Sequence, residues 1–198
     1  MELRGELASG RPLIVVAVPE EAKSLDTTLP VLLTGMGKVN AATALALTLG
    51  RGPLPSLVVN LGSAGALRPG LRGLYVVRTV IQHDFATDLI RKLTGVVYGA
   101  PITLADGDAA ADGAVVLATG DAFIADTTAR DVLAERADLV DMEGYALAAA
   151  AATAGVPVSL VKHVSDEADE NAARTWRDSV AVTARDLAAW AAANLPGY

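Results

Sequence analysis

The stretch from Leu139 to His163 reads LVDMEGYALAAAAATAGVPVSLVKH and contains the pattern on which the fold depends. Its first four residues, Leu139–Met142, are mostly apolar and predict a short buried strand. The alanine-rich segment Glu143–Ala154 predicts a helix, which a glycine and a proline terminate. The apolar run Val156–His163 predicts the next strand. Strands that alternate with helices are typical of a largely parallel or mixed sheet with helices on both faces.

The same alternation extends over the rest of the chain. Further strands are expected at Pro12–Val18, Val31–Leu33, Ser56–Asn60, Leu74–Gln82 and Ala114–Ala118. Helices are expected at Lys38–Leu49, Asp126–Arg136 and Asn171–Asn194, with a short helix or turn at Glu20–Leu25. The segment from His83 to Asp112 has weak periodicity and is expected to be mostly loop with short strands. At 198 residues, one α/β domain spanning residues 1–198 is the default.

Composition excludes several classes of function. The net charge is −7 and no run of Lys or Arg occurs, so neither nucleic acid nor an anionic membrane is an expected partner. The chain contains no cysteine, which excludes disulfides and thiolate chemistry. With only two histidines, His83 and His163, no metal site is expected.

One uncharged segment, Gly144–Val161, is long enough to cross a membrane. Most of it is alanine, which is barely hydrophobic, and Gly155 and Pro157 interrupt it. A helix, a turn and the start of a strand explain it better. The chain is therefore expected to be soluble and cytoplasmic.

The turn Thr34–Lys38, with sequence TGMGK, suggests a phosphate-binding loop, but both familiar patterns fail. A P-loop requires glycine where Leu32 stands and Ser or Thr where Val39 stands. A dinucleotide fingerprint requires a third glycine where Asn40 stands. A tight turn between a strand and a helix is the better interpretation.

Other polar motifs follow expected strands, where α/β sheets gather their ligands. Gly62–Gly65 offers backbone N–H groups and a hydroxyl to a ligand, although such loops are more often simple turns. Glu143 begins a helix, where a carboxylate is favourable in any case, or it accepts hydrogen bonds from sugar hydroxyls. Asp166 is equally compatible with catalysis and with capping a loop. Glu20-Glu21 and His83-Asp84, taken alone, favour solvated charges and a hydrogen-bonded loop pair.

The order and spacing of six motifs carry more information than any one of them. Glu20-Glu21 is followed by TGMGKVNAA from Thr34 and by NLGSAGAL from Asn60. GDAFI from Gly120, DMEG from Asp141 and VSDEAD from Val164 complete the series. The series resembles the purine nucleoside phosphorylase superfamily, and within it the 5′-methylthioadenosine/S-adenosylhomocysteine nucleosidases. The resemblance implies one α/β domain with a central twisted mixed sheet flanked by helices. It also implies a homodimer, a small purine nucleoside as the binding partner, and no cofactor.

The resemblance implies a catalytic role for three carboxylates. Asp166 looks like the general acid that protonates N7 of the purine, and Ser165 like the neighbour that steadies its loop. Glu143 looks like the carboxylate that binds the ribose hydroxyls, above the apolar wall of Met142. Glu21 falls where the family keeps the glutamate that orients the attacking water. An acid of this kind needs a raised pKa to hold its proton near neutral pH.

Three further residues match substrate-binding positions of the family. Phe123 resembles the residue that stacks on the base, and the backbone of Ile124 resembles the group that reads the base edge. Ser63 lies in the loop near the attacking water.

Two departures from the phosphorylases favour water over phosphate as the nucleophile. The bacterial phosphorylases that this chain resembles carry an arginine where Asn60 stands. They carry a glycine-rich, arginine-bearing segment where Pro19-Glu20-Glu21 stands, and a carboxylate there would repel phosphate. The expected enzyme is a hydrolase that acts on an adenosine-type nucleoside. A phosphate-dependent phosphorylase, a futalosine-type hydrolase and a non-catalytic nucleoside-binding protein are the alternatives.

The chain also departs from the nucleosidases. The segment from Phe85 to Lys92 is less aromatic and more charged than its counterpart, which helps to form the pocket for the 5′ substituent. The identity of that substituent is therefore open. Lys162 stands where the nucleosidases usually have arginine, and Asp141 replaces a common glutamate.

Overall fold

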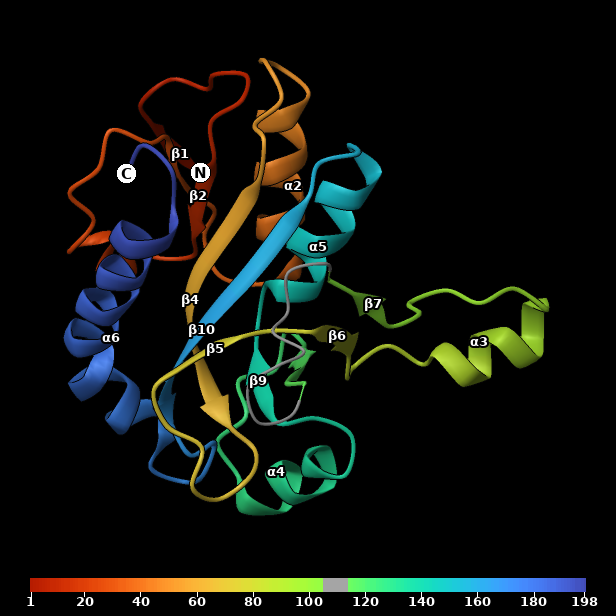
Figure 1. Ribbon diagram of the computed structural model, residues 1–198. Helices are drawn as coiled ribbons and strands as arrows, with labels where there is room; N and C mark the ends of the chain where they lie inside the picture. The colour runs from red at the N-terminus through yellow and green to blue at the C-terminus, as the bar shows by residue number, and fades with distance from the viewer. Residues whose placement is uncertain (105–113) are drawn as a thin grey trace.

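The computed structural model describes residues 1–104 and 114–198 and contains one mixed sheet between layers of helices (Figure 1). The strands are β1 (Glu2–Arg4), β2 (Leu13–Val16), β3 (Val31–Leu33), β4 (Val58–Ala66), β5 (Leu74–Val76), β6 (Thr79–Gln82), β7 (Ile102–Thr103), β8 (Val116–Thr119), β9 (Leu139–Asp141) and β10 (Val158–Asp166). The helices are α1 (Pro19–Ala22), α2 (Lys38–Leu49), α3 (Thr87–Thr94), α4 (Thr127–Ala134), α5 (Gly144–Thr153) and α6 (Ala172–Asn194). The predicted α/β class with a mixed central sheet is confirmed.

β4 is the strand that joins the two halves of the sheet. Its first residues pair parallel with β2, and Gly65 and Ala66 pair antiparallel with β9. β10 runs parallel to β4, from the pair Val158–Val58 to the pair Asp166–Gly65. The antiparallel pairing sets the carboxyl end of β9 beside the middle of β4. Polar residues from distant parts of the chain meet there.

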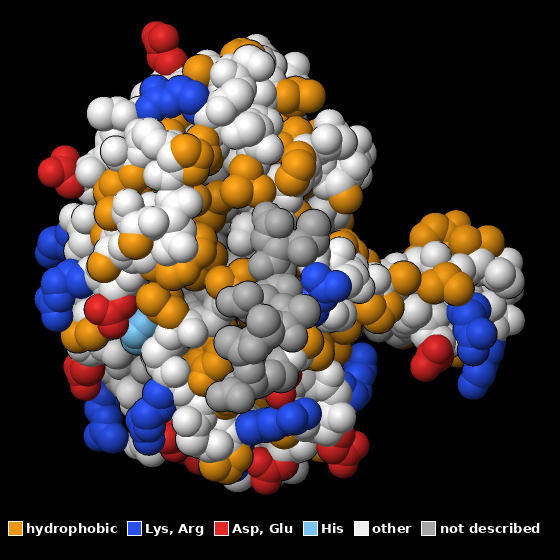
Figure 2. Space-filling view, in the orientation of Figure 1, with side chains coloured by type: hydrophobic (Ala, Val, Ile, Leu, Met, Phe, Trp, Pro, Cys, Tyr) orange, Lys and Arg blue, Asp and Glu red, His pale blue; other side chains and the backbone are white. Residues whose placement is uncertain are grey.

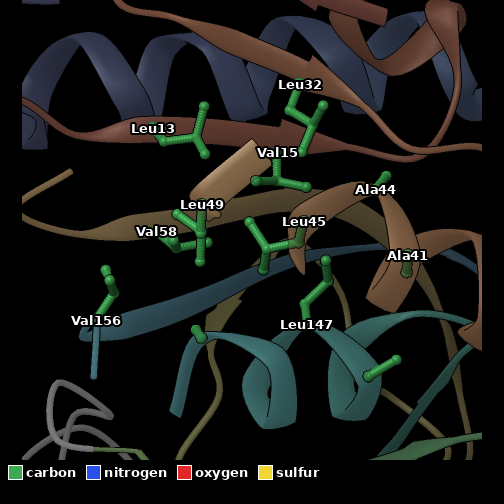
Figure 3. Close-up of a cluster of buried hydrophobic side chains, with 12 residues drawn as sticks. Leu13, Val15, Leu32, Ala41, Ala44, Leu45, Leu49, Val58, Leu147 and Val156 are labelled. Atoms are coloured by element: carbon green, nitrogen blue, oxygen red, sulfur yellow. The ribbon is translucent and has the colours of Figure 1, made fainter. Parts of the chain in front are cut away.

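Helices cover both faces of the sheet. α2 and α5 pack on one face through a cluster in which Leu45 and Leu147 point toward each other (Figure 3). The other face packs against α6 through Leu187 and Ala191. Burying one leucine contributes about 1.5–3 kcal/mol. Both helices contribute alanines to this cluster, and these small side chains allow close packing.

The segment Gly62–Gly65 corrects the sequence-based expectation, because it lies inside β4 and is no turn. The glycines make room for charged side chains of the neighbouring strand. A Cβ on Gly62 would lie 2.9 Å from Nζ of Lys162, and one on Gly65 would lie 3.0 Å from Oδ1 of Asp166. Close approach, not a turn, explains these glycines.

Three other expectations need correction. The single strand expected at Leu74–Gln82 is two strands, because β5 pairs with β10 whereas β6 pairs with β8. The segment expected to be mostly loop contains α3, and residues 105–112 of that expectation lie outside the described residues. The first strand of the sheet, β1, was not expected; it pairs antiparallel with β3.

Candidate active site

One pocket gathers residues from seven parts of the chain: the ends of β2, β3, β8, β9 and β10, the middle of β4 and the start of α6. The empty space that it contains, with its open mouth included, is about 670 Å³. The lining consists of Ala17, Val18, Glu21, Met36, Ser63, Ala64, Gly65, Ala122, Phe123, Ile124, Val140, Asp141, Met142, Glu143, Ser165, Asp166 and Trp176. All eight residues that the sequence predicted for the site are among them.

Glu21 lies in α1 and is almost fully buried, with both carboxylate oxygens accepting hydrogen bonds. The N–H of Ala17 donates to Oε2 at 3.0 Å. The N–H and the hydroxyl of Ser63 donate to Oε1 at 2.8 and 2.9 Å. Trp176 Nε1 in turn donates to the Ser63 hydroxyl oxygen at 3.0 Å, so this hydroxyl has one fixed orientation. Glu21 and Ser63 therefore form a rigid pair on one side of the pocket.

Asp166 is placed by an irregularity in β10. The register with β4 skips Ser165, and this bulge turns Asp166 toward Gly65. The Ser165 hydroxyl donates to Oδ2 of Asp166 at 2.8 Å, and the N–H of Ala168 donates to Oδ1 at 2.9 Å. Ala168 adopts a left-handed backbone with φ of 49°, which shows how tightly this loop is held. Burial raises the pKa of Asp166, and it outweighs the two hydrogen bonds that lower it. A carboxyl group with a raised pKa is suited to donate a proton.

A buried ion pair lies beneath the pocket. Lys162 is about 1% exposed, and its Nζ lies 2.8 Å from Oδ2 of Asp141. Oδ1 of Asp141 accepts a 2.6 Å hydrogen bond from the Thr119 hydroxyl, and Oδ2 also accepts the N–H of Gly144 at 2.7 Å. Burial alone would lower the pKa of Lys162, but Asp141 and the neighbouring Glu143 raise it above its ordinary value. Lys162 is therefore a cation that lies among carboxylates.

Glu143 precedes the first residue of α5 and is the carboxylate with the most perturbed environment. Its Oε1 accepts the N–H of Gly37 at 2.8 Å. Burial, followed by the charge of Asp141, raises the pKa of Glu143 to about 7, whereas Lys162 and the Gly37 hydrogen bond oppose the shift. Glu143 thus changes its charge near neutral pH.

The remaining walls are apolar. Phe123 is about half exposed at the mouth, while Ile124 and Met142 are partly buried. The loop that carries Phe123 and Ile124 follows β8, and Asp126 then caps α4, because its carboxylate accepts the N–H of Ala129. A flat apolar ring beside hydrogen-bonding backbone is a suitable wall for an aromatic base.

The charge of the lining is its most informative property. It contains four carboxylates, Glu21, Asp141, Glu143 and Asp166, and none of its described residues is Lys or Arg. Such a pocket suits a substrate part that becomes positive during the reaction and repels an anionic co-substrate.

Sequence reasoning did not assign a role to three residues at this site. Trp176 has no periodic or motif signal, because it reaches the pocket from the start of α6. Asp141 and Lys162 stood out in the sequence only as departures from a family pattern, and their pairing depends on how β9 and β10 flank β4. The roles of the eight predicted residues remain predictions.

Comparison with known proteins places this pocket in context. A model of the phosphorylase superfamily matches residues 23–195. The 5′-methylthioadenosine/S-adenosylhomocysteine nucleosidase of Geobacillus thermodenitrificans is 30% identical over 188 residues, which cover 85% of this chain and 79% of the relative. The nucleosidase of Anoxybacillus flavithermus is 33% identical over 184 residues and 83% of this chain, with 79% of the relative covered.

Solved structures share the fold. A Helicobacter pylori MTAN mutant with 5′-methylthioadenosine in the active site matches with a TM-score of 0.82 and 21% identity, covering 94% of this chain and 98% of that one. The futalosine hydrolase of the same organism matches with a TM-score of 0.75 and 20% identity, covering 91% and 95%.

Replacing the buried cation tests its role beneath the pocket. Lys162→Met keeps the volume of the side chain but leaves Asp141 buried without its charged partner. We expect the free energy of unfolding, measured by urea denaturation, to fall by about 3–5 kcal/mol. Lys92→Met, at an exposed lysine of α3, serves as the control and should leave stability unchanged. Adding Asp141→Asn to Lys162→Met should recover part of the loss. Equal stability of Lys162→Met and the wild type would contradict this account.

Proposed function

The chain belongs to the phosphorylase superfamily, and we propose that within it this protein is a purine nucleosidase. It uses water to cleave the N-glycosidic bond of an adenosine-type nucleoside, of the methylthioadenosine or S-adenosylhomocysteine kind. The observation that carries this proposal is the charge of the pocket, which has four carboxylates and, among its described lining residues, no Lys or Arg.

In the proposed reaction, the base leaves as a neutral purine. Asp166 donates a proton to N7, and burial raises its pKa in the direction that favours the protonated form. Phe123 stacks on the base and the backbone of Ile124 reads its edge. As the bond to C1′ lengthens, positive charge grows on the sugar, and nearby carboxylates stabilise that charge. Ionised Glu143 accepts hydrogen bonds from the ribose hydroxyls above Met142.

Water attacks from the side of Glu21. Both oxygens of Glu21 already accept hydrogen bonds from the protein, which fixes the carboxylate against Ser63. A fixed carboxylate can orient water toward C1′ and accept its proton. Phosphate in the same place would face this carboxylate. Asn60, where phosphorylases carry arginine, is buried and donates to the carbonyl oxygen of Val15 at 3.1 Å.

The protruding α3 arm, residues 83–101, supports a homodimer as the working form. No residue of α3 is buried, and Leu89 and Leu93 lie on one face of the helix with most of their surface exposed. Figure 2 shows the hydrophobic side chains of this arm on one side and its basic ones on another. An apolar surface of this kind marks a contact with another protein. We expect it to pack on the groove between α2 and α5 of a second copy, lined by Val39, Ala42 and Leu54 among others.

The described part of the chain includes no helix with the length and apolar character that crossing a bilayer demands. We expect the protein to work in the cytoplasm.

A substrate panel tests the proposed function. The enzyme is incubated with methylthioadenosine, S-adenosylhomocysteine, adenosine, inosine and futalosine, each with and without phosphate, and base and sugar are separated by chromatography. We expect base and free sugar without phosphate. Formation of a sugar 1-phosphate only with phosphate would instead identify a phosphorylase, and preference for futalosine would identify a futalosine-type hydrolase.

Substitution of the acid and of the water-orienting carboxylate tests their roles. In Asp166→Asn and Glu21→Gln we expect turnover to fall by a factor of about 10²–10⁴, and unchanged turnover would refute the assigned role.

The pH dependence follows from two carboxyl groups with opposite requirements. The active form needs ionised Glu143, whose titration places one limb of the kcat/KM profile near pH 7. It also needs protonated Asp166, so activity should be lost as the pH rises above the raised pKa of Asp166. A bell-shaped profile with one limb near pH 7 is expected from initial rates. A profile without a limb near pH 7 would exclude the role of Glu143.

The dimer is tested at the arm. The double variant Leu89→Asp, Leu93→Asp places two charges on the apolar face of α3, and we expect it to sediment with the mass of one chain, 20.2 kDa, in analytical ultracentrifugation. Arg91→Asp reverses a charge on the opposite side of the same helix and should leave the dimer intact. If the wild type itself sediments as a single chain, the proposed dimer is wrong.

A further inference from the structure

Two sequence motifs without a role in the proposed reaction meet in space behind the pocket. The TGMGK turn contributes Lys38, and the His83-Asp84 pair at the base of the arm contributes Asp84. The Lys38 ammonium donates to Oδ1 of Asp84, with side-chain exposures of only 17% and 28%. The same ammonium lies 3.4 Å from Oε1 of Gln82 and 3.8 Å from Oδ2 of Asp121.

Asp121 connects this ion pair to a third loop, the one that carries Phe123. Its N–H donates to Oδ2 of Asp84 at 2.9 Å, and its Oδ1 accepts the backbone N–H of Lys38 at 2.8 Å. The ring of His83 lies against Gly120, the residue before Asp121, since a Cβ on Gly120 would lie 2.2 Å from Nε2 of His83. Three loops are therefore joined by side-chain charges and by two backbone amides.

Two of these loops, the turn before Lys38 and the loop after Asp121, continue into the pocket wall. Met36 and the turn residue Gly37 precede Lys38, and the N–H of Gly37 is the donor that holds Oε1 of Glu143. Phe123 and Ile124 follow Asp121 by two and three positions. Gly37 has a φ of 92°, so its N–H direction depends on a backbone that only glycine adopts readily.

We propose that Lys38, Asp84 and Asp121 form a clasp that positions the Gly37 N–H on Glu143 and holds the loop that carries Phe123. They are positioning residues, because none of them lines the pocket. This inference rests on the proposed function only in the assignment of Glu143 and Phe123 to the substrate.

An exposed ion pair alone would contribute little, and the clasp differs in two respects. Its carboxylates accept backbone amides, which fixes the chain and not only the side chains. Its central pair is largely shielded. Burial by itself would raise the pKa of Asp84, but the hydrogen bonds from Lys38 and from the Asp121 amide hold that pKa below its ordinary value.

Asp84→Ala is the test variant, because Asp84 contacts neither the pocket nor Glu143. In the full-length protein we expect KM for the nucleoside to rise about tenfold, the loss typical of one charge-assisted hydrogen bond. Amide exchange followed by NMR should become faster at the backbone amides of Lys38 and Gly37, which donate to Asp121 and Glu143 and not to Asp84. Faster exchange at Asp121 alone would show only the loss of its own acceptor and would overturn the clasp.

A pH profile adds a readout that a purely structural role would not move. The Gly37 hydrogen bond lowers the pKa of Glu143, against the effects of burial, Asp141 and Glu21 and alongside that of Lys162. When the clasp opens, the limb of the kcat/KM profile that Glu143 sets near pH 7 should therefore move to higher pH. An unchanged limb together with an unchanged KM would overturn the proposal.

Matched variants separate the clasp from a general loss of structure. Asp131→Ala removes an exposed carboxylate that pairs with Arg130 on α4, and it should change neither KM nor amide exchange. Asp84→Asn keeps one acceptor oxygen, so its KM should rise less than that of Asp84→Ala. If Asp84→Ala does not fold, Lys38→Met and Lys38→Arg provide the same comparison, with rescue expected only from arginine. If the wild type cleaves no nucleoside, the proposed function fails, and the exchange rates of Gly37 and Lys38 then decide on the clasp alone.

Discussion

The buried ion pair between Lys162 and Asp141 is the interaction on which the rest of the site depends. Four carboxylates around one pocket would repel one another, and each would be costly to bury in its charged form. Lys162 lies among three of them and is held in its charged form by them. One carboxylate, Asp141, pairs with this cation and accepts the N–H of Gly144 at the start of α5. The others stay available, and their different surroundings give them different tasks.

Those surroundings divide the work between acid and base. Asp166 is buried and accepts two hydrogen bonds, and burial is the largest influence on its raised pKa. Glu21 accepts hydrogen bonds from the backbone just before α1 and from Ser63 of β4, whereas Glu143 accepts one backbone amide from the described residues. One pocket thus contains a carboxyl group suited to donate a proton and carboxylates suited to stabilise positive charge, and their surroundings make the difference.

Much of this arrangement could be predicted from the sequence, and the failures have physical causes. The alternation around Leu139–His163 predicted the α/β class, because α5 and β10 there are uninterrupted, mostly apolar segments. The glycines of Gly62–Gly65 were misread as a turn, since close approach by Lys162 and Asp166 leaves no local signal. Motif order brought eight residues to one pocket, but Trp176 and the partners of Lys162 depend on strand pairing between segments about a hundred residues apart. α3 was missed because none of its residues is buried in the described part of the chain, so the helix has no core-facing stripe.

The TGMGK and His83-Asp84 motifs suggest how the loops of this site are held in position. Strands fix Ser63 and Asp166 through the sheet, whereas Gly37 and Phe123 lie on loops that the sheet leaves free. Loops at a pocket need an independent constraint, because an error of about 1 Å in a catalytic contact costs much of its effect. The contacts among Lys38, Asp84 and Asp121 supply one, and they begin where the α3 arm leaves the body. The residues that connect the arm to the sheet are therefore the same residues that fix the wall on which the base would stack.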